Sequence, residues 1–163
     1  MIDLLSKHWV FQWRGMPRPD NLWWIWPNYI GIETALNTGA LFGFGQNQAQ
    51  LFAVLSFAAA SGILYWLFIA GGISDWILTI CLGCMMGGIL GNLYDRLALW
   101  TAPGVARGEI HAVRDWILLR YGNFTWPNFN IADSLLVSAA ILMIWHQVRL
   151  GHSSTVKSAG DTG

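Results

Sequence analysis

Charge is scarce in this sequence of 163 residues. Charged residues make up 11% of it, and 9 basic and 9 acidic side chains leave a formal net charge of zero. Nucleic-acid binding requires a basic face, so this composition excludes nucleic acid as a partner. Cysteine is scarce too: Cys81 and Cys84 lie one helical turn apart, and two ligands alone make a poor zinc site. We interpret them as packing thiols and expect neither a metal nor a cofactor.

Apolar residues, in contrast, are abundant. They make up 55% of the chain, and the mean hydropathy of +0.43 is too high for an ordinary soluble domain of this length. The 11 tryptophans fit a multi-span protein, because this side chain collects where acyl chains meet water. Met1 is followed almost at once by Asp3, without the basic and apolar regions of a cleavable signal peptide. We therefore expect the spans themselves to direct insertion.

Three stretches have the pattern of membrane spans. The stretch 51–70 carries no charge and is long enough to cross the hydrocarbon. The uncharged run 76–94 lies between Asp75 and Asp95, which a helix would place roughly 30 Å apart, at opposite faces of the bilayer. A third uncharged run, 134–148, spans the bilayer if its ends are included.

The remaining segments are expected to lie outside the hydrocarbon. Segment 8–50 mixes tryptophans with polar residues and predicts an interfacial elaboration, with a short strand over 30–36. Segment 101–129 contains several glycines and prolines and predicts a loop with short structure at most. Residues 1–10 are apolar but too short to cross, and they fit either a surface turn or the outer end of a helix. We expect one membrane-embedded domain over 1–150 and a disordered polar tail over 151–163.

Connectivity alone brings polar groups to one membrane surface. The short link 71–75 joins the first two spans, so the start of the first span and the end of the second share a face. The segment 101–129 keeps the start of the third span on that same face. We therefore expect the following residues to collect there: Asn37, Asn92, Asp95, Arg96, Asp115, Asn130 and Asp133.

Several of these residues have a structural explanation as well as a functional one. Asp95 and Arg96 fit a boundary between membrane and water, and each needs its own partner because adjacent residues do not face one another on a helix. Asn130 followed by Asp133 predicts an N-cap with a capping box at the start of the third span. Asp115 taken alone indicates a solvated charge in a loop.

Turns and helix packing explain further positions. Asn37 fits a turn, and Asn92 fits a contact between helices. Gly83, Gly87 and Gly91 fall at four-residue spacing, which favours the close approach of another helix. We assign these three glycines to packing and not to catalysis.

Four motifs taken together resemble those of the lipoprotein signal peptidases, the bacterial signal peptidase II family. Residues 37–43, NTGALFG, resemble the family's Asn-x-Gly-Ala-x-Phe element, and residues 87–96, GGILGNLYDR, are similar to its GGxxGNxxDR element. Residues 129–134, FNIADS, resemble FNxADS, and residues 3–7, DLLSK, resemble DxxSK at the end of the family's first helix. Each motif alone is weak, but all of them in this order are highly specific. The resemblance runs from Ile2 to about Arg149.

The resemblance implies roles for individual residues. The family's catalytic aspartates lie in a Val-x-Asp-Phe element and in FNxAD, and these positions correspond to Asp115 and Asp133. The match at Asp115 is looser, because Arg114 stands where the family usually has an aliphatic residue and Trp116 replaces Phe. The implied substrate contacts are Asn37, Gly39, Asn92, Arg96 and Asn130. The residues implied to support the fold are Asp3, Lys7 and Asp95.

The resemblance also implies a fold and a cellular location. It predicts an all-α, four-helix transmembrane bundle with a small extracytoplasmic β and loop elaboration, in the bacterial cytoplasmic (inner) membrane. This chain begins almost at the element that closes the family's first helix. We expect a miscalled start and not a true loss of that helix, and four spans in the complete protein.

Charge alone gives the opposite orientation. The family places its active site towards the outer face, whereas the positive-inside rule would assign the more basic side to the cytoplasm. Only Arg149 and Lys157 mark the far side. We give the motifs more weight, because the first helix and its flank normally weigh heavily in orientation and are absent here. The basic residues expected on the site side are Lys7, Arg14, Arg18, Arg107, Arg114 and Arg120.

The implied activity is that of an intramembrane aspartic endopeptidase acting on diacylglyceryl-modified prolipoproteins, with cleavage before the lipidated cysteine. Two buried carboxylates a few Å apart cannot both ionise cheaply, so one holds a proton while the other activates water. We expect Asp115 to hold the proton more often, because Asp133 lies at a helix N-terminus. The expected partners are the prolipoprotein, membrane lipid and an inhibitor of the globomycin type.

Two other classes of protein remain as alternatives. A non-catalytic membrane scaffold or binding protein could retain the fold without the activity. A small transporter would place its polar groups near the bilayer midplane, whereas the polar residues of this chain fall at the ends of the predicted spans.

Overall fold

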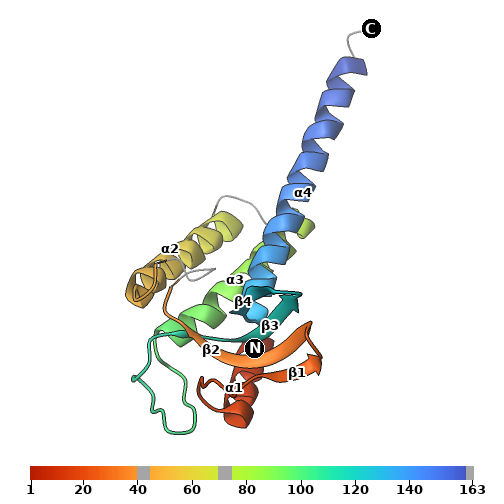
Figure 1. The fold of residues 1–163 in the computed structure, drawn as a ribbon. Helices are drawn as coiled ribbons and strands as arrows, with labels where there is room; N and C mark the ends of the chain where they lie inside the picture. Colours follow the sequence, from red (N-terminus) through yellow and green to blue (C-terminus); the bar gives the residue numbers. More distant parts are fainter. Residues whose placement is uncertain (40–44, 70–74, 161–163) are drawn as a thin grey trace.

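The computed structural model describes residues 1–39, 45–69 and 75–160, with side chains up to residue 149. In these ranges the element order is α1 (Ile2–Arg14), β1 (Trp23–Trp26), β2 (Ile30–Asn37), α2 (Ala49–Phe68), α3 (Trp76–Arg96), β3 (Val113–Tyr121), β4 (Phe124–Phe129) and α4 (Ile131–Gly160). Figure 1 shows the sheet at one end of the helices, with α3 between α2 and α4.

Three of these helices are long and apolar enough to cross a membrane, over Ala49–Phe68, Trp76–Arg96 and Ile131–Arg149. They coincide with the three predicted spans. Only 6% of the α2 segment is buried inside the protein, against 39% of the α3 segment. Helix α3 is therefore the central helix, and the apolar surface of α2 is left for lipid, which is as apolar as the side chains themselves. A bundle of four spans stays a prediction.

Helix α1 resolves the two interpretations of residues 1–10 in favour of a helix. Its buried residues recur at helical spacing and its charged ones face inward, because Asp3 and Lys7 are buried while Trp9 and Trp13 are exposed. This polarity is the reverse of that of a helix on a soluble protein. It delivers two charged side chains to the interior beside α3 and α4.

The four strands form one antiparallel sheet in the order β1-β2-β3-β4. The strand predicted over 30–36 is confirmed as part of β2, which pairs with β3 so that Asn37 lies opposite Val113 and Ala35 opposite Asp115. A tight turn with Gly122 at positive φ connects β3 to β4. Strand β4 ends at Phe129, directly before α4. The sheet therefore fixes both Asp115 and the first residues of α4.

The prediction of a loop with short structure at most over 101–129 was wrong for its second half. Strands β3 and β4 have 9 and 6 residues and continue the sheet begun by β2. Arg114 and Asp115 are buried in β3, so the strand lacks the alternation of apolar and polar residues by which a half-buried strand is recognised. Pairing with β2, more than 70 residues earlier, satisfies its backbone instead.

The predicted glycine stripe is only partly a packing surface. A Cβ atom on Gly88 would lie 2.7 Å from the carbonyl oxygen of Ala132, and one on Gly91 would lie 2.6 Å from Oδ2 of Asp3. Helices α4 and α1 thus approach α3 closely at these two positions, of which only Gly91 belongs to the predicted stripe. Gly83 and Gly87 have no heavy atom within 4 Å of such a Cβ among the described residues, so for them the prediction of close packing was wrong.

Helix α4 continues beyond the predicted end of the membrane-embedded part. Its backbone is helical to Gly160, whereas composition predicts a disordered tail over 151–163. Adding a residue to an existing helix is far easier than starting one, so the apolar span supports a polar extension. Residues 161–163 lie outside the described ranges.

Candidate active site

The N-terminus of α4 is closed by a reciprocal pair of hydrogen bonds. The backbone amide of Asp133 donates to Oδ1 of Asn130 over 3.0 Å, and the amide of Asn130 donates to Oδ2 of Asp133 over 3.2 Å. This is the predicted capping box, which satisfies two backbone amides that the helix itself leaves without partners. The cap fixes the direction of the Asp133 carboxylate relative to Asn130.

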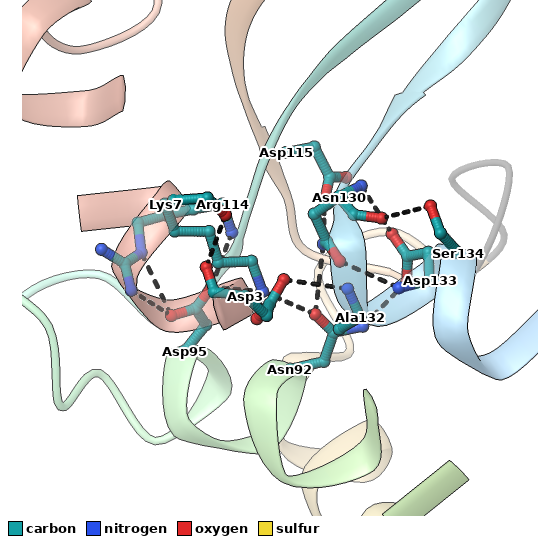
Figure 2. Close-up of polar contacts among 11 residues, drawn as sticks. Asp3, Lys7, Asn92, Asp95, Arg114, Asp115, Asn130, Ala132, Asp133 and Ser134 are labelled. Atoms are coloured by element: carbon teal, nitrogen blue, oxygen red, sulfur yellow. Dashed lines mark hydrogen bonds and ion pairs between the residues drawn. The ribbon is translucent and has the colours of Figure 1, made fainter. Parts of the chain in front are cut away.

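Asn130 also contacts the second acidic residue. Its Nδ2 donates to Oδ1 of Asp115 over 2.6 Å, and both side chains are buried. Figure 2 shows Asn130 between Asp115, which comes from β3, and Asp133, which comes from α4. The interpretation of Asp115 as a solvated loop charge is therefore wrong, because β3 carries it into the interior. One asparagine holds both carboxylates in a common environment.

Asn92, near the end of α3, completes the connection between the two acids. Its Nδ2 donates to Oδ1 of Asp133 over 2.8 Å, and its Oδ1 accepts from Nδ2 of Asn130 over 3.1 Å. The same oxygen accepts from Nζ of Lys7 over 2.8 Å. Because a lysine is only a donor, Lys7 determines which end of the Asn92 amide faces Asp133.

Four charged residues form a buried cluster beside this chain of amides. Lys7 pairs with Asp3 at 2.8 Å and with Asp95 at 3.2 Å, and Arg114 pairs with Asp95 at 2.7 Å. Asp3 in turn accepts a hydrogen bond from the backbone amide of Ala132 over 2.9 Å. The cluster has two positive and two negative charges, which is the condition under which buried charges are tolerated.

The environment raises the pKa of Asp115 to about 7. Burial is the largest cause, because removal from water disfavours the ionised form, and the negative charge of Asp133 acts in the same direction. Hydrogen bonds from Asn130 and Asn37 and the positive charge of Lys7 oppose the shift. Asp115 therefore exchanges its proton near neutral pH, where a general acid works best.

Two further predicted residues lie next to Asp115, at the end of β2. Oδ1 of Asn37 accepts from the backbone amide of Gly39 over 2.9 Å, in the predicted turn, and the Asn37 side chain also bonds to Asp115. Nη2 of Arg96 donates to the carbonyl oxygen of Gly39 over 2.9 Å, and the guanidinium lies over the ring of Phe52. Residues 40–43 of this motif lie outside the described ranges.

A cavity of about 540 Å³ opens beside Asp133. Its walls come from the sheet and from one face of α4, and apolar side chains provide most of its surface. Asp133 is the only charged residue among those that line it, which are Leu119, Trp126, Phe129, Asp133, Ser134, Val137 and Ser138. The site thus combines an acidic group with an apolar wall at the end of a membrane-spanning helix.

The contacts above join every residue that the sequence assigned to the site into one network. Asp95 and Arg96 have separate partners, as predicted from their adjacency. Arg114 was not predicted as a member of the site: the sequence marked it as a departure from a motif and as one of the basic residues on the site side. No periodicity or spacing indicates that Arg114 faces Asp95, which lies 19 residues earlier. Within the described ranges, no three His, Cys, Asp or Glu side chains form a metal-binding group.

The sequence of this chain is similar to those of known signal peptidases. The family model described as signal peptidase (SPase) II matches residues 1–149. The lipoprotein signal peptidase of Rhodopirellula baltica is 49% identical over 144 residues, which cover 88% of this chain and 65% of that protein. The lipoprotein signal peptidase of Pseudomonas fluorescens is 38% identical over 122 residues, which cover 72% of this chain and 65% of that protein. The chain thus spans slightly less than two thirds of the length of these relatives.

Two solved structures of bacterial membrane enzymes have the same fold. One superimposes with a TM-score of 0.74 at 23% identity, covering 91% of this chain and 81% of the other. The second has a TM-score of 0.69 at 21% identity, covering 90% of this chain and 84% of the other. At this identity the likeness concerns the arrangement of helices and sheet.

Proposed function

The chain belongs to the signal peptidase II family, and on this premise we propose that it is an aspartic endopeptidase of the membrane. It removes signal peptides from prolipoproteins and cleaves before a cysteine that carries a diacylglyceryl group. Asp115 and Asp133 are its catalytic pair. The observation that carries the proposal is the position of Asn130 between the two carboxylates: its side chain donates to Asp115 over 2.6 Å, and its backbone amide donates to Asp133 over 3.2 Å.

The two acids divide the chemistry of peptide hydrolysis. Asp133, whose carboxylate accepts from Asn92 and from the backbone of Asn130, takes a proton from water. The water oxygen attacks the scissile carbonyl carbon while Asp115 gives its proton to the carbonyl oxygen. When the tetrahedral species collapses, the leaving amine takes a proton from Asp133, and the new carboxyl group returns one to Asp115. The raised pKa of Asp115, about 7, supports its role as the group that begins protonated.

The surroundings of the pair suit a substrate with an apolar part and a peptide part. The cavity beside Asp133 receives apolar groups between the sheet and α4. The peptide backbone lies across the polar side, where amide and guanidinium groups offer directional hydrogen bonds. The residues that we assign to substrate binding are Asn37, Gly39, Asn92, Arg96 and Asn130. We assign a supporting role, holding these residues in place, to Asp3, Lys7 and Asp95.

The protein is a multi-pass membrane protein with three helices able to span the bilayer. We place it in the inner membrane, with the catalytic pair towards the outer face. One of the basic residues that argued for the opposite orientation, Arg114, is buried and paired with Asp95, so it does not act as a loop charge. Reaction of the variant Arg107→Cys, with Cys81 and Cys84 replaced, with an impermeant thiol reagent in intact cells tests the orientation, and we expect labelling from outside.

Cleavage of a lipidated precursor by the purified protein in detergent tests the activity. We expect wild-type turnover that globomycin inhibits, and we expect Asp115→Asn and Asp133→Asn each to lower it by at least ~10²-fold while the protein still inserts. Asp75→Asn is the matched control, because Asp75 lies at the other end of α3. A folded wild-type protein without turnover would support the scaffold alternative, and activity in either dyad variant would refute the catalytic pair.

A further inference from the structure

Arg114 is buried, and both its side chain and its backbone amide donate to one carboxylate. It is 2% exposed, and its Nε and Nη2 donate to Oδ1 of Asp95 over 3.1 and 2.7 Å. Its backbone amide donates to Oδ2 of the same carboxylate over 3.0 Å. The guanidinium also lies 4.9 Å from the ring centre of Trp100 and 5.9 Å from that of Phe11. Both ends of Arg114 are thus bound to one carboxylate of α3 (Figure 2).

Asp95, the partner of Arg114, also pairs with Lys7, the lysine that orients the amide of Asn92. Asp95 is fully buried and lies 3.2 Å from Lys7. A lysine has three donors, and here they point to Asp3, Asp95 and Oδ1 of Asn92. If Arg114 were neutral, Lys7 would be the only positive group for two buried carboxylates, which leaves a net negative charge in the interior. Asp95 would then compete with Asn92 for Lys7.

We propose that Arg114 is a positioning residue for the pair Asp115 and Asp133. By neutralising Asp95, it leaves one donor of Lys7 on Asn92, and the Nδ2 of Asn92 then faces Asp133. By tying β3 to α3, it also fixes the strand position directly before Asp115. This inference rests on the proposed function for its effect on turnover, but the effect on Asp115 is independent of turnover.

The charges around Asp115 determine the sign of the electrostatic effect. Three charged groups act on Asp115: Asp133 from α4, Lys7 from α1 and Arg96 from α3. The nearby ion pair of Arg114 and Asp95 has no net charge. Loss of the Arg114 charge adds the negative charge of Asp95, which disfavours the ionised form of Asp115. The pKa of Asp115 then rises further above its ordinary value, and activity that depends on it moves to higher pH.

The decisive experiment is a double-mutant cycle. Arg114→Met keeps the apolar stem but removes the charge, and we expect kcat to fall about tenfold or more because the pair is misplaced, with KM little changed. The double variant Arg114→Met with Asp95→Asn removes both charges, and we expect it to recover most of the lost kcat. Arg120→Met is the matched control on the same strand, because Arg120 contacts Trp24 and Thr125 instead of an acid.

A second measurement separates this inference from the proposed function. Infrared spectra report the carbonyl stretch of protonated Asp115, identified by its loss in Asp115→Asn, and its pH midpoint requires no substrate. We expect the midpoint to rise by about one pH unit in Arg114→Met and to return in the double variant. If the wild type fails to cleave a precursor, the proposed function is wrong. The titration of Asp115 still tests the role of Arg114 in that case.

Three outcomes would overturn the proposal. One is an unchanged midpoint and unchanged kcat in folded Arg114→Met; another is a lower thermal stability with no change in either quantity. The third is a double variant no better than Arg114→Met. If Arg114→Met does not fold, Arg114→Lys keeps the charge but lacks the fork of donors. We then expect the midpoint to stay near that of the wild type while kcat falls, and equal kcat would contradict the role in positioning.

Discussion

At each end of α3 a carboxylate takes part in the contact between this helix and α4, but the two carboxylates lie in opposite environments. At one end, Asp75 caps α3 through the amide of Leu78 over 3.0 Å and bonds His146 of α4 over 2.6 Å. At the other end, Asn92 and Asn130 connect α3 with the capping box of α4 and with Asp115. Both ends thus join the same two helices through a hydrogen-bonded aspartate.

Burial and neighbouring charge separate the two ends. The Asp75 side chain is 30% exposed, and the amide of Leu78, followed by His146, lowers its pKa. Asp115 is 2% exposed and has a second acid beside it, so its pKa rises to about 7. A carboxylate with donors at the water boundary stays charged and acts as a link between helices. A carboxylate buried beside another acid can exchange a proton, which is what catalysis requires.

The largest contrast is expected from removing the side chain that bonds the carboxylate at each end, Asn130 at the site end and His146 at the other. Asn130→Ala loses the donor to Asp115, the contact with Asn92 and the cap of α4, so we expect cleavage to fall by at least ~10²-fold and stability to fall by ~1 kcal/mol. His146→Ala should cleave at a rate close to that of the wild type. Turnover of a lipidated precursor and thermal unfolding in detergent measure both effects. Similar activity in the two variants would show that the two ends of α3 do not differ in their importance for cleavage.

The next contrast concerns pH. Because the folded-state pKa of Asp115 lies above its unfolded value, the folded protein binds more protons between about pH 4 and 7, and its stability falls as pH rises through this range. Asp115→Asn removes this dependence, so we expect the inactive variant to be more stable than the wild type at pH 8, by roughly 1–3 kcal/mol. At pH 4 the two should unfold together. Melting curves across this range test the sign, and a less stable variant at pH 8 would contradict it.

A smaller contrast comes from the glycines of α3. A methyl group on Gly88 meets the Ala132 carbonyl and Leu136 at 2.7 Å, so we expect Gly88→Ala to destabilise the protein by ~1–3 kcal/mol. Gly83→Ala, nearer to Asp75, adds a methyl group in open space and should be neutral or stabilise the helix by about 0.5–1 kcal/mol. Thermal unfolding of both variants in the same detergent gives the difference. Equal stabilities would show that α3 and α4 are not closely packed at the site end.

The smallest effect is expected at Asp75. Its lowered pKa means that its contribution to stability is present above the unfolded pKa and is lost as pH falls through the folded one. Asp75→Asn should therefore be slightly less stable than the wild type at pH 7, and the difference should shrink in acid. Cleavage should be unaffected. A difference that persists undiminished at a pH low enough to protonate Asp75 would contradict this.

Part of the fold could be predicted because its causes are local. Uninterrupted apolar runs gave the three spans, and the spacing of Asn130 and Asp133 gave the capping box. The strand β2 was also predicted, whereas β3 was not, because its buried Arg114 and Asp115 disguise the pattern of a strand. Gly83 and Gly87 have the spacing of a packing surface, but spacing cannot show whether a second helix lies opposite.

By itself, the sequence determined which residues gather at one end of the helices, since spans of fixed length and short links leave little choice of side. Only the tertiary structure decided which of these residues contact each other. In it Lys7 orients Asn92, Asn130 donates to Asp115, and Arg114 neutralises Asp95. Hydrophobicity acts on each segment separately and is therefore readable along the chain. Hydrogen bonds and ion pairs between residues such as Asp3 and Ala132, 129 positions apart, depend on how the helices and the sheet pack together.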